Sequence, residues 1–351
     1  MNKTVIYLVL LALLGVGVYF FVFKENDPFS GDDSNFTIKD TGSITHIFMA
    51  DKMGQQVDLK RTDSGWVIND RYPAIPRVVS SFLRTLNDQQ AQYPAPKNQH
   101  NNAITGLAAS GIKVELYGKG NKKIKVFYVG GQVGQFGTFM LMDGAKRPYV
   151  VQIPGFEGYL TPRYSTDIKT WRDRTVFNFS RDQIKRIDLQ YATEPLNSFT
   201  LTNNGGKIDV KAHEELMKGK PVNVRRAEAY AGFFTEIYAE GYLNGTHKLD
   251  SLISNAPKRA AIEVESVTGK VQHIDIYWMA VNQRSKNQSI PSQNIPDGFD
   301  ADRSYAVMNN FRDTMLIQHF TFDKLFRKGY EFFEADPVQQ TINPQAMELA
   351  K

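Results

Sequence analysis

The sequence predicts an α+β protein, with an N-terminal transmembrane helix and two tandem, related domains. Each domain is expected to be an antiparallel sheet with one packed helix, in the order β-β-β-α-β-β-β. Three observations predict this architecture. The chain of 351 residues, 42% of them hydrophobic, contains a long uncharged apolar run near its start. Segments with apolar residues at alternate positions, separated by turn residues, fill much of the remainder. This series of segments, with one amphipathic helix, occurs twice along the chain.

The first element is the apolar run from Thr4 to Phe23, which carries no formal charge. In a helix that rises about 1.5 Å per residue, about twenty residues cross a hydrocarbon core of roughly 30 Å. The run ends in large aromatic residues rather than the small residues of a cleavage site, so we expect an uncleaved anchor over 1–24. Lys3 precedes the run, and acidic residues follow Lys24, which favours a cytoplasmic N-terminus. The expected location is therefore the inner (cytoplasmic) membrane, in a single pass through the lipid bilayer, with the C-terminal domain in the periplasm.

A polar linker is expected over 25–40, where Asp, Ser, Asn and Gly are frequent. The sequence has no cysteine, which excludes disulfides, thiolate metal ligands, a cysteine nucleophile and a lipid anchor on an N-terminal cysteine. Two of the five net positive charges belong to Lys3 and Lys24, so the remaining chain is close to neutral and has no concentrated basic stripe. We therefore expect no nucleic-acid partner.

The first α+β repeat is predicted over 41–178, and it opens with three short alternating segments. An amphipathic helix follows, whose apolar residues recur with helical spacing: Ile75, Val78, Val79, Phe82, Leu83 and Leu86. In the next strand, Ile124, Val126 and Tyr128 are expected to face the core, and Lys123 and Lys125 to face solvent. The last two strands are expected at 137–142 and 150–152.

The second α+β repeat is predicted over 179–336, before a C-terminal tail at 337–351. When the two repeats are aligned, Ile187 in its opening strand corresponds to Ile44 of the first repeat. The apolar stripe of its helix consists of Ala227, Tyr230, Ala231, Phe234, Ile237 and Tyr238. Later strands match those of the first repeat in the same order, and the spacing changes mainly where polar loops lengthen. We interpret this as a duplication, and the alternative is two similar but unrelated α+β domains.

The motifs of common catalytic and cofactor sites are missing from the sequence. The glycine-rich segment from Val129 to Gly137 is followed by another predicted strand rather than a helix, which favours a hairpin over a phosphate-binding loop. The six histidines show no metal-ligand spacing, and there is no GxSxG or SxxK. We therefore expect no enzymatic activity, no cofactor and no metal. A hydrolase with carboxylates on distant loops stays open as an alternative.

The candidate interaction surface lies at the junction of the two repeats. Trp, Tyr and Arg are enriched at interface hot spots, and the junction is rich in them: Tyr159, Arg163, Tyr164, Trp171, Arg172 and Arg174. One alternative is a hinge in which Trp171 and Phe177 pack and the arginines form surface ion pairs. Another is a carbohydrate platform made by Trp171, Tyr159, Tyr164 or Tyr149. The long polar loop 279–302 is a second candidate surface or a disordered segment.

Several segments of the first repeat carry a family resemblance: GWVIND, YPAIPRVVSSFLRTL, GIKVELYG, KVFYVGG, GTFMLMDG, YVVQIPGF and WRDRTVF. With the N-terminal span, the chain resembles the family catalogued as domain of unknown function 4340, clearly over about residues 40–180 and weakly in the second repeat. The resemblance implies a bacterial envelope protein with one N-terminal span and an extracytoplasmic β-rich domain. Some members are associated with ABC-type transport systems related to the gliding-motility type.

The expected function follows from these observations together. The chain is predicted to be a non-enzymatic, membrane-anchored periplasmic accessory or scaffold protein of a bacterial envelope machine, with an ABC-type transport system as one candidate. Its expected partners are the bilayer, through residues 4–23, and proteins of the envelope. The alternative is a module that binds cell-wall glycan or another carbohydrate and is tethered to the inner membrane.

Overall fold

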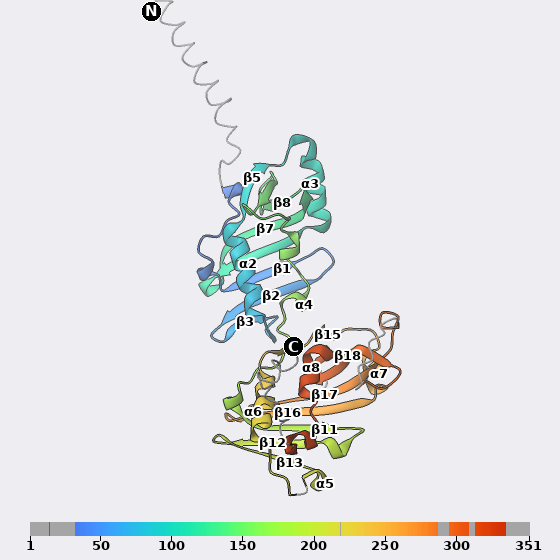
Figure 1. The fold of residues 1–351 in the computed structure, drawn as a ribbon. Helices are drawn as coiled ribbons and strands as arrows, with labels where there is room; N and C mark the ends of the chain where they lie inside the picture. The colour runs from blue at the N-terminus through green and yellow to red at the C-terminus, as the bar shows by residue number, and fades with distance from the viewer. Residues whose placement is uncertain (1–13, 15–31, 218, 287–294, 309–312, 335–351) are drawn as a thin grey trace, which may run out of the picture. The chain divides into compact units, whose positions relative to one another are not determined.

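The computed structural model describes Leu14 and residues 32–217, 219–286, 295–308 and 313–334 (Figure 1). It divides into two compact units, Met1–Asp173 and Arg174–Lys351. Both are mixed α+β units of antiparallel sheet with few helices, which confirms the predicted fold class at that level. Apart from Leu14, the predicted span lies outside the described residues, as do residues 25–31 of the predicted linker and the whole tail. The rest of that linker, 32–40, is not a simple polar connection, because Phe36 and Ile38 are buried in the core of the first unit. In the part of the chain that is described, no helix is long and apolar enough to cross a membrane.

The first unit is built on a nine-stranded sheet with the order β4-β3-β2-β1-β6-β7-β8-β9-β5. Its neighbouring strands pair antiparallel, from β1–β2 to β5–β9. Its strands are β1 (His46–Ala50), β2 (Gln56–Thr62), β3 (Gly65–Ile68), β4 (Tyr72–Pro73), β5 (Gln90–Pro94), β6 (Ile112–Gly118), β7 (Lys122–Val133), β8 (Gly137–Met142) and β9 (Tyr149–Gln152). Its helices are α2 (Pro76–Asp88), α3 (Lys97–Ser110) and α4 (Ile168–Trp171).

Helix α2 lies across one face of this sheet (Figure 1). Pro76 occupies its first turn, where the missing N–H costs little. Val79, Phe82 and Leu86 are buried in the core of the unit. The amphipathic stripe predicted from the sequence is therefore confirmed for these residues, and burial of that stripe fixes the helix on the sheet.

Residues alternate between the two faces of strand β7 as predicted, but the face that was expected to be exposed to solvent is the one that contacts the main core. Phe127 and Val129 point into the core, whereas Ile124 is exposed. Lys125 shares the parity of the core residues, and its ammonium donates to backbone carbonyls, including that of Thr37 at 3.1 Å. The prediction for Ile124, Val126 and Tyr128 is thus wrong in phase.

The physical reason is that the second face of the sheet is also covered. A Cβ atom at Gly130 would lie 3.0 Å from Leu107 Cδ2, so α3 packs closely against β7 there. Val126 shares this face with Gly130 and is buried outside the main core. With apolar residues on both faces, alternation alone could not tell which face was the core. The predicted glycine hairpin is confirmed, because β7 and β8 pair antiparallel around Gly134.

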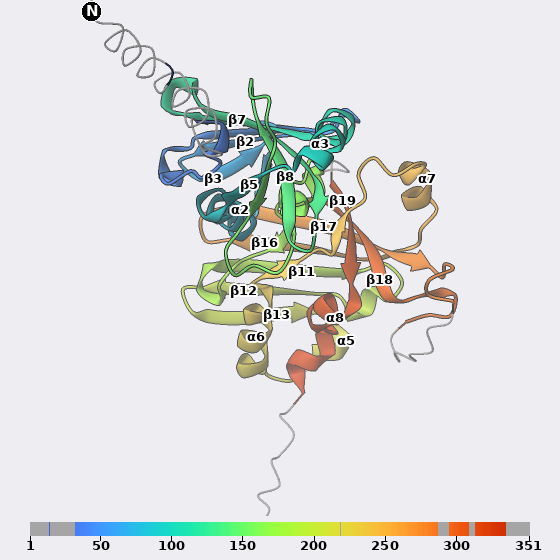
Figure 2. The same cartoon turned by 90° about the horizontal axis from the view of Figure 1, so that it is seen from above.

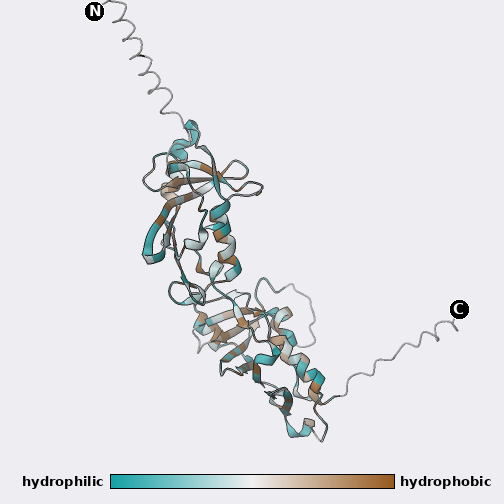
Figure 3. Cartoon of the chain, turned by 90° about the vertical axis from the view of Figure 1, so that its left-hand side faces the viewer, coloured by the Kyte–Doolittle hydropathy of each residue, from teal (hydrophilic) through white to brown (hydrophobic). Residues whose placement is uncertain are grey.

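The second unit has an eight-stranded sheet with the order β13-β12-β11-β16-β17-β18-β19-β15 (Figure 2). Its strands are β11 (Ile184–Tyr191), β12 (Phe199–Asn204), β13 (Lys207–Ala212), β15 (Gly241–Tyr242), β16 (Lys258–Ser266), β17 (Val271–Ala280), β18 (Phe299–Met308) and β19 (Asp313–Gln318). A separate two-stranded sheet joins β10 (Thr175–Phe177) to β14 (Ile237–Tyr238). The strands alternate hydrophobic and hydrophilic residues, as Figure 3 shows by colour.

In the described ranges, three short helices lie between these strands, α5 (Glu214–Met217), α6 (Val224–Ala231) and α7 (Leu249–Ser254), and α8 (His319–Phe322) follows the last strand. The 3-10 segments used below are η7 (Pro195–Asn197), η8 (Gly232–Phe234), η9 (Asp323–Leu325) and η10 (Gly329–Phe333). The helix predicted to reach Tyr238 ends earlier, because Ile237 and Tyr238 form strand β14. Glu236 has a positive φ of 55°, a conformation that ends a right-handed helix.

The predicted order β-β-β-α-β-β-β is also incomplete in both units. Between the main helix and the later strands, the first unit has β5, α3 and β6, and the second has β15, α7 and β16. Strand β15 is only two residues long, and α3 is rich in Asn and Gln with Ala103 and Leu107 as its buried residues. Neither element has a periodic apolar pattern long enough to be recognised in a sequence.

Candidate functional site

The aromatic residues of the predicted interaction surface lie mostly in the core of the first unit. Tyr164 and Trp171 are 0% and 1% exposed, and both rings meet Phe82 edge-on at 5.2 and 5.3 Å between centroids. The Tyr164 hydroxyl donates to the Gln89 side chain, and Trp171 Nε1 donates to the Ser165 carbonyl at 2.9 Å. Burial raises the pKa of Tyr164 above its ordinary value. These two side chains therefore act in packing.

The carbohydrate platform is wrong for three of its four residues. Tyr149, like Tyr164 and Trp171, is buried, at 2% exposure. A sugar ring stacks only on an aromatic face that is open to solvent, and these faces are covered by protein. Tyr159 remains partly exposed, at 38%. One open ring does not make the coplanar platform that the sequence interpretation requires.

The arginines of the predicted surface have different environments. Arg172 is buried with its guanidinium 3.7 Å from the Tyr72 ring centroid. Arg163 is half-buried, lies 4.4 Å from the Phe156 ring and donates from Nη1 to Thr85 Oγ1 at 3.1 Å. Arg174 is exposed and belongs to the second unit, where its Nη1 donates to the Glu240 carbonyl at 2.6 Å. The six predicted residues therefore do not form one surface within either unit.

What remains of the predicted surface is a groove beside α2 in the first unit, with a volume of about 360 Å³. One wall comes from α2 and the other from the segment that contains Arg163 and Trp171. Its polar lining includes Arg77, Ser81, Thr85 and Thr170. The Arg163 guanidinium already donates to Thr85 across the groove, so part of its hydrogen-bonding capacity is used within the unit.

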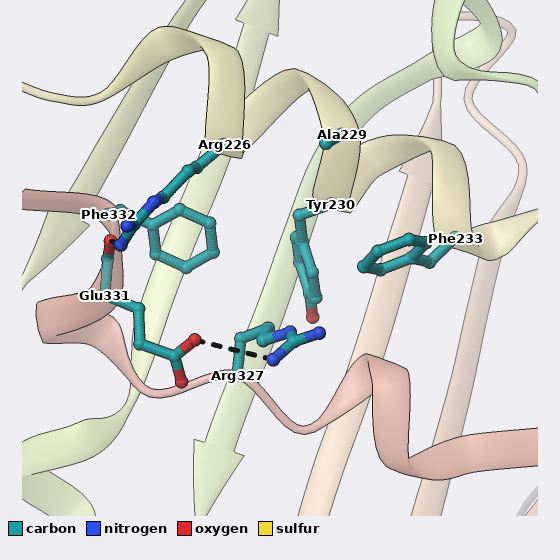
Figure 4. Close-up of a pocket in the computed structure, with 7 residues that line it drawn as sticks. All are labelled: Arg226, Ala229, Tyr230, Phe233, Arg327, Glu331 and Phe332. Atoms are coloured by element: carbon teal, nitrogen blue, oxygen red, sulfur yellow. Dashed lines mark hydrogen bonds and ion pairs between the residues drawn. The ribbon is translucent and has the colours of Figure 1, made fainter. Parts of the chain in front are cut away.

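The second unit has a cavity of about 340 Å³ between α6 and the segment that ends in η10 (Figure 4). Its wall from α6 and η8 consists of Arg226, Ala229, Tyr230 and Phe233. The facing wall consists of Arg327, Glu331 and Phe332. We call this the α6 cavity. It combines aromatic rings and arginines, the types that the sequence analysis sought at the repeat junction.

Local structure fixes the side chains of the α6 cavity. The Asn223 side chain caps α6 by accepting from the Arg226 backbone N–H at 3.2 Å. The Tyr230 hydroxyl donates to the Leu325 carbonyl at 2.9 Å, and its ring meets Phe332 at 5.5 Å between centroids. Arg226 Nη1 donates to the Glu331 carbonyl at 2.9 Å, which ties the helix to the facing wall. The cavity is therefore held by directional contacts on both sides.

A second cavity of about 560 Å³ adjoins the first, because Arg327 and Glu331 line both. These two side chains form an ion pair at 3.6 Å. We call this the Arg259 cavity, after its most buried charged residue. Its other lining includes Tyr191, Glu194, Trp278, Asp323, Phe326 and Lys328.

Arg259 is held tightly near the start of β16, with 6% of its surface exposed. Its guanidinium lies 3.6 Å from the Phe326 ring and 4.4 Å from the Trp278 ring. Nη2 donates to Asp323 Oδ1 at 3.4 Å, and the buried Nη1 has no hydrogen-bond partner among the described residues. Burial lowers the pKa of this guanidinium, whereas the Asp323 carboxylate raises it.

Ser304 and His319 form a buried pair near this cavity, with Oγ and Nε2 2.8 Å apart. The other ring nitrogen, Nδ1, lies 3.0 Å from the Ala301 carbonyl oxygen. A serine nucleophile and its histidine base need a hydrogen bond of this kind, but they must also be accessible to a substrate. Neither residue lines either cavity described above. We therefore interpret the two hydrogen bonds as structural contacts within the core. Burial lowers the pKa of His319, and the charge of Arg259 lowers it further.

The described histidines and acids form no group of three or more metal-ligand side chains. His273 lies 3.3 Å from both Glu263 and Asp275 on the outer face of β16 and β17. The described ends of loop 279–302 are joined by Arg284, which pairs with Asp300 at 2.9 Å and with Asp302 at 3.3 Å. Residues 287–294 of this loop lie outside the described part.

Sequence reasoning missed the residues that line the Arg259 cavity, except Ile295 and Pro296, which belong to the candidate loop 279–302. Its walls come from β11, β16, β17 and the region around η9 and η10, so no short motif contains them. One signal was available: Arg259 is a charged residue directly before the apolar run Ala260, Ala261 and Ile262. A charged residue at the buried start of a strand indicates a buried cation that is paired with an acidic or aromatic side chain elsewhere in the fold.

The fold and the cavities define an α+β protein with two large antiparallel sheets, and with ligand-sized cavities in its second unit. The family described as Domain of unknown function (DUF4340) matches residues 66–253, more than half of the chain. The chain belongs to this family, as its motifs predict. The matched stretch begins in β3, crosses the boundary between the units and ends in α7. A search among curated proteins and a search among solved structures found no match.

Proposed function

We propose that the protein is a non-enzymatic accessory or scaffold subunit of a bacterial envelope machine, with an ABC-type transport system as one candidate. Its predicted span would anchor it in the inner membrane, and the two units would lie in the periplasm. The observation that carries the scaffold function is the α6 cavity. Arginine and aromatic side chains dominate its lining, and such side chains supply most binding energy at protein interfaces.

The chemistry of the described residues supports binding rather than catalysis. The pair closest to a nucleophile and base, Ser304 with His319, is buried and has a backbone carbonyl in place of the orienting acid. By contrast, Ala229 and Phe233 lie on the exposed side of α6 and η8, and both line an open cavity (Figure 4). A partner side chain could enter this cavity without rearrangement of the sheet.

The two units are proposed to be related copies of one ancestral domain. The strands of the first unit are numbered in chain order. When β4 is left out, their order across the sheet is 3-2-1-6-7-8-9-5. If β10 is left out of the count and β14 is taken as the fourth strand of the second unit, the second sheet has the same order. The strand registers also agree: Ile47 lies opposite Leu59 and Leu116, and Ile187 lies opposite Leu201 and Val264. This register supports pairing Ile187 with Ile47 rather than with Ile44.

The test of the scaffold function is co-purification of the full chain from its native membranes in mild detergent. The variant Ala229→Arg fills the α6 cavity from an exposed helical position, where arginine is a good helix former. We expect the wild type to emerge with stoichiometric protein partners and Ala229→Arg to lose them. Ala108→Arg is the matched control, because Ala108 is also an exposed helical alanine but lies on α3 of the first unit.

Two outcomes would contradict the proposal. The wild-type chain could purify without any protein partner, or the Ala229→Arg variant could retain every partner of the wild type. Location is tested separately by adding protease to spheroplasts. The anchored, periplasmic arrangement predicts digestion of both units while cytoplasmic proteins survive. Protection of the units would contradict that location without affecting the partner test.

A further inference from the structure

The groove beside α2 in the first unit goes beyond the proposed scaffold function, because it is a separate site with a chemistry of its own. We call it the α2 groove. Its volume of about 360 Å³ lies within the range of roughly 300–1,000 Å³ that ligand pockets have. Arg77 and Arg163 line it, and its described lining includes no aspartate or glutamate. Arg77 is exposed and Arg163 is half-buried, so both side chains present surface to solvent.

Neither arginine of the α2 groove is neutralised within the first unit. In the described ranges, neither has an ion pair. Arg163 donates to the Thr85 hydroxyl at 3.1 Å and lies 4.4 Å from the Phe156 ring, and these contacts leave its charge without a carboxylate. Arg77 is in the first turn of α2, where a cation opposes the helix dipole. Its charge therefore does not stabilise the helix, and it is available to an anion.

The two arginines lie toward opposite ends of the α2 groove. Arg77 belongs to the first turn of α2, whereas Arg163 is held at Thr85, about two turns or about 12 Å further along the helix axis. Val78 is half-buried and Pro162 is exposed, and both line the groove. The groove therefore offers two separated cations with apolar surface beside them.

The second unit has a cavity at the corresponding place. The lining residues of the two main helices have the same spacing: Val78, Ser81, Phe82 and Thr85 in the first unit, and Arg226, Ala229, Tyr230 and Phe233 in the second. In each unit the facing wall comes after the strand β9 or β19 and contributes one arginine, Arg163 or Arg327. The α2 groove and the α6 cavity are therefore equivalent sites.

In the second unit, the chain itself supplies the anions for this site. Arg226 Nη1 lies 3.2 Å from Glu334 Oε2, and Arg327 Nη1 lies 3.6 Å from Glu331 Oε2. Phe332, between these two acids, lines the cavity. The α2 groove has the arginines of this arrangement without its carboxylates.

We propose that the α2 groove binds an acidic segment of a partner protein, in which two carboxylates three residues apart flank apolar side chains. One carboxylate pairs with Arg77 and the other with Arg163, and the apolar side chains lie against Val78 and Pro162. In an extended segment, three residues span about 10 Å, close to the separation of the two ends of the groove. Carboxylates fit better than phosphates, because carboxylates neutralise the arginines of the equivalent site.

The test is titration of a fluorescently labelled peptide with the full chain in mild detergent, followed by anisotropy. The peptide has the sequence of residues 329–334, GYEFFE, with both ends blocked. The comparison peptide has glutamine in place of both glutamates. The glutamate peptide is expected to bind about tenfold more tightly, because it forms two ion pairs that the other lacks. Raising the salt from about 0.1 M to about 1 M should remove most of this difference.

Two variants locate the peptide, and both positions are exposed on α2. Arg77→Gln should weaken binding of the glutamate peptide about threefold, and the preference that remains measures the pair with Arg163. Ser81→Glu places a carboxylate in the groove one turn from Arg77, where it pairs with that arginine and repels the peptide, so binding should weaken about tenfold. The matched control is Arg84→Gln, which changes the net charge equally on the same helix but lies outside the groove lining.

Equal binding of the two peptides by the wild type would overturn the proposal. Arg84→Gln weakening binding as much as Arg77→Gln would show a general charge effect rather than a site. Loss of all preference in Arg77→Gln would overturn the role of Arg163. Ala229→Arg, in the α6 cavity, should leave peptide binding unchanged, and loss of binding there would place the peptide in the wrong unit. None of these results depends on native partners, so failure here is distinguishable from failure of the scaffold function.

Discussion

Arg259 and His319 show how burial of single residues sets the electrostatics of the second unit. Both lie beside Trp278: the guanidinium is 4.4 Å from its ring, and the imidazole meets it edge-on at 6.0 Å. Burial disfavours the charged form of each and lowers both pKa values. Arginine keeps its proton despite this change, whereas histidine titrates near neutral pH. His319 is therefore the residue at which stability should respond to pH.

The pH prediction concerns His319→Gln. Burial, followed by the charge of Arg259, holds the pKa of His319 in the folded chain below its ordinary value of 6.5. As pH falls below about 6.5, the unfolded chain takes up a proton that the folded chain refuses, so stability is complete above this pH and is lost below it. Glutamine does not titrate, and its amide can replace the contacts to Ser304 and Ala301. The melting temperature, measured from about pH 8 down to about pH 5, should therefore fall less steeply for the variant than for the wild type.

The same pH slope in both proteins would contradict the assignment of this effect to His319. The control is His273→Gln, because His273 is on the outer face of the sheet beside Glu263 and Asp275. Loss of the Ser304 contact alone would lower stability at every pH by a similar amount. The change in slope, rather than the change at one pH, therefore tests the role of burial.

At the scale of elements, the helices and strands that could be predicted from the sequence are those with apolar residues along one face over a long stretch. Helix α2 was predicted because Val79, Phe82 and Leu86 form an apolar stripe over about two turns. Strand β7 was predicted in the wrong phase because Phe127 and Val126 are buried on opposite faces. The end of α6 was missed because the chain passes into the 3-10 segment η8 and then takes a positive φ at Glu236, both within an apolar stretch.

The candidate site could not be predicted from local patterns in the same way. Trp171 and Tyr164 have the composition of an interface, but the structure uses them to fill the core beneath α2. Arg259 reaches its partners Asp323, Trp278 and Phe326 only through the strand order of the second sheet. A site assembled from distant segments requires the fold before its residues can be recognised.

The element that positions both cavities is η10, and Gly329 is the tightest point of its packing. A Cβ atom there would lie 2.9 Å from Ala212 Cβ and 3.1 Å from the Ser198 carbonyl oxygen. Gly329→Ala therefore forces η10 away from β13 and η7. We expect a loss of about 1–3 kcal/mol in the free energy of unfolding, as for other overpacked sites. Because Glu331 and Phe332 line the α6 cavity, this displacement also changes the wall of that cavity.

The matched control is Gly232→Ala, where an added Cβ meets nothing within 4 Å and φ is negative, at −68°. This change should be neutral or stabilise the chain by up to about 1 kcal/mol, because alanine restricts the unfolded state. Denaturant unfolding measures the stability of both variants. Equal stability of Gly329→Ala and the wild type would show that η10 tolerates displacement, against the packing described here.

At the scale of the whole molecule, each unit has a hydrophobic core of its own. One core gathers residues of the first unit around Ile47, and the other gathers residues of the second unit around Ile187. The sequence predicted two domains from the repeated order of segments, and the strand registers place these two isoleucines at equivalent positions. If the copies are related and each is stabilised by its own core, equivalent substitutions should have equivalent and local effects.

The last prediction compares Ile47→Ala with Ile187→Ala in the full chain. Each removes a fully buried side chain from an interior strand of its sheet and should cost about 2–5 kcal/mol, through lost burial and the cavity left behind. Hydrogen exchange followed by mass spectrometry should show faster exchange only in the unit that carries the change, because local opening follows cooperative units. Each variant is the matched control of the other. Faster exchange throughout both units from either substitution would mean that the two cores unfold as one, and the description of the chain as two separately stabilised copies would then be wrong.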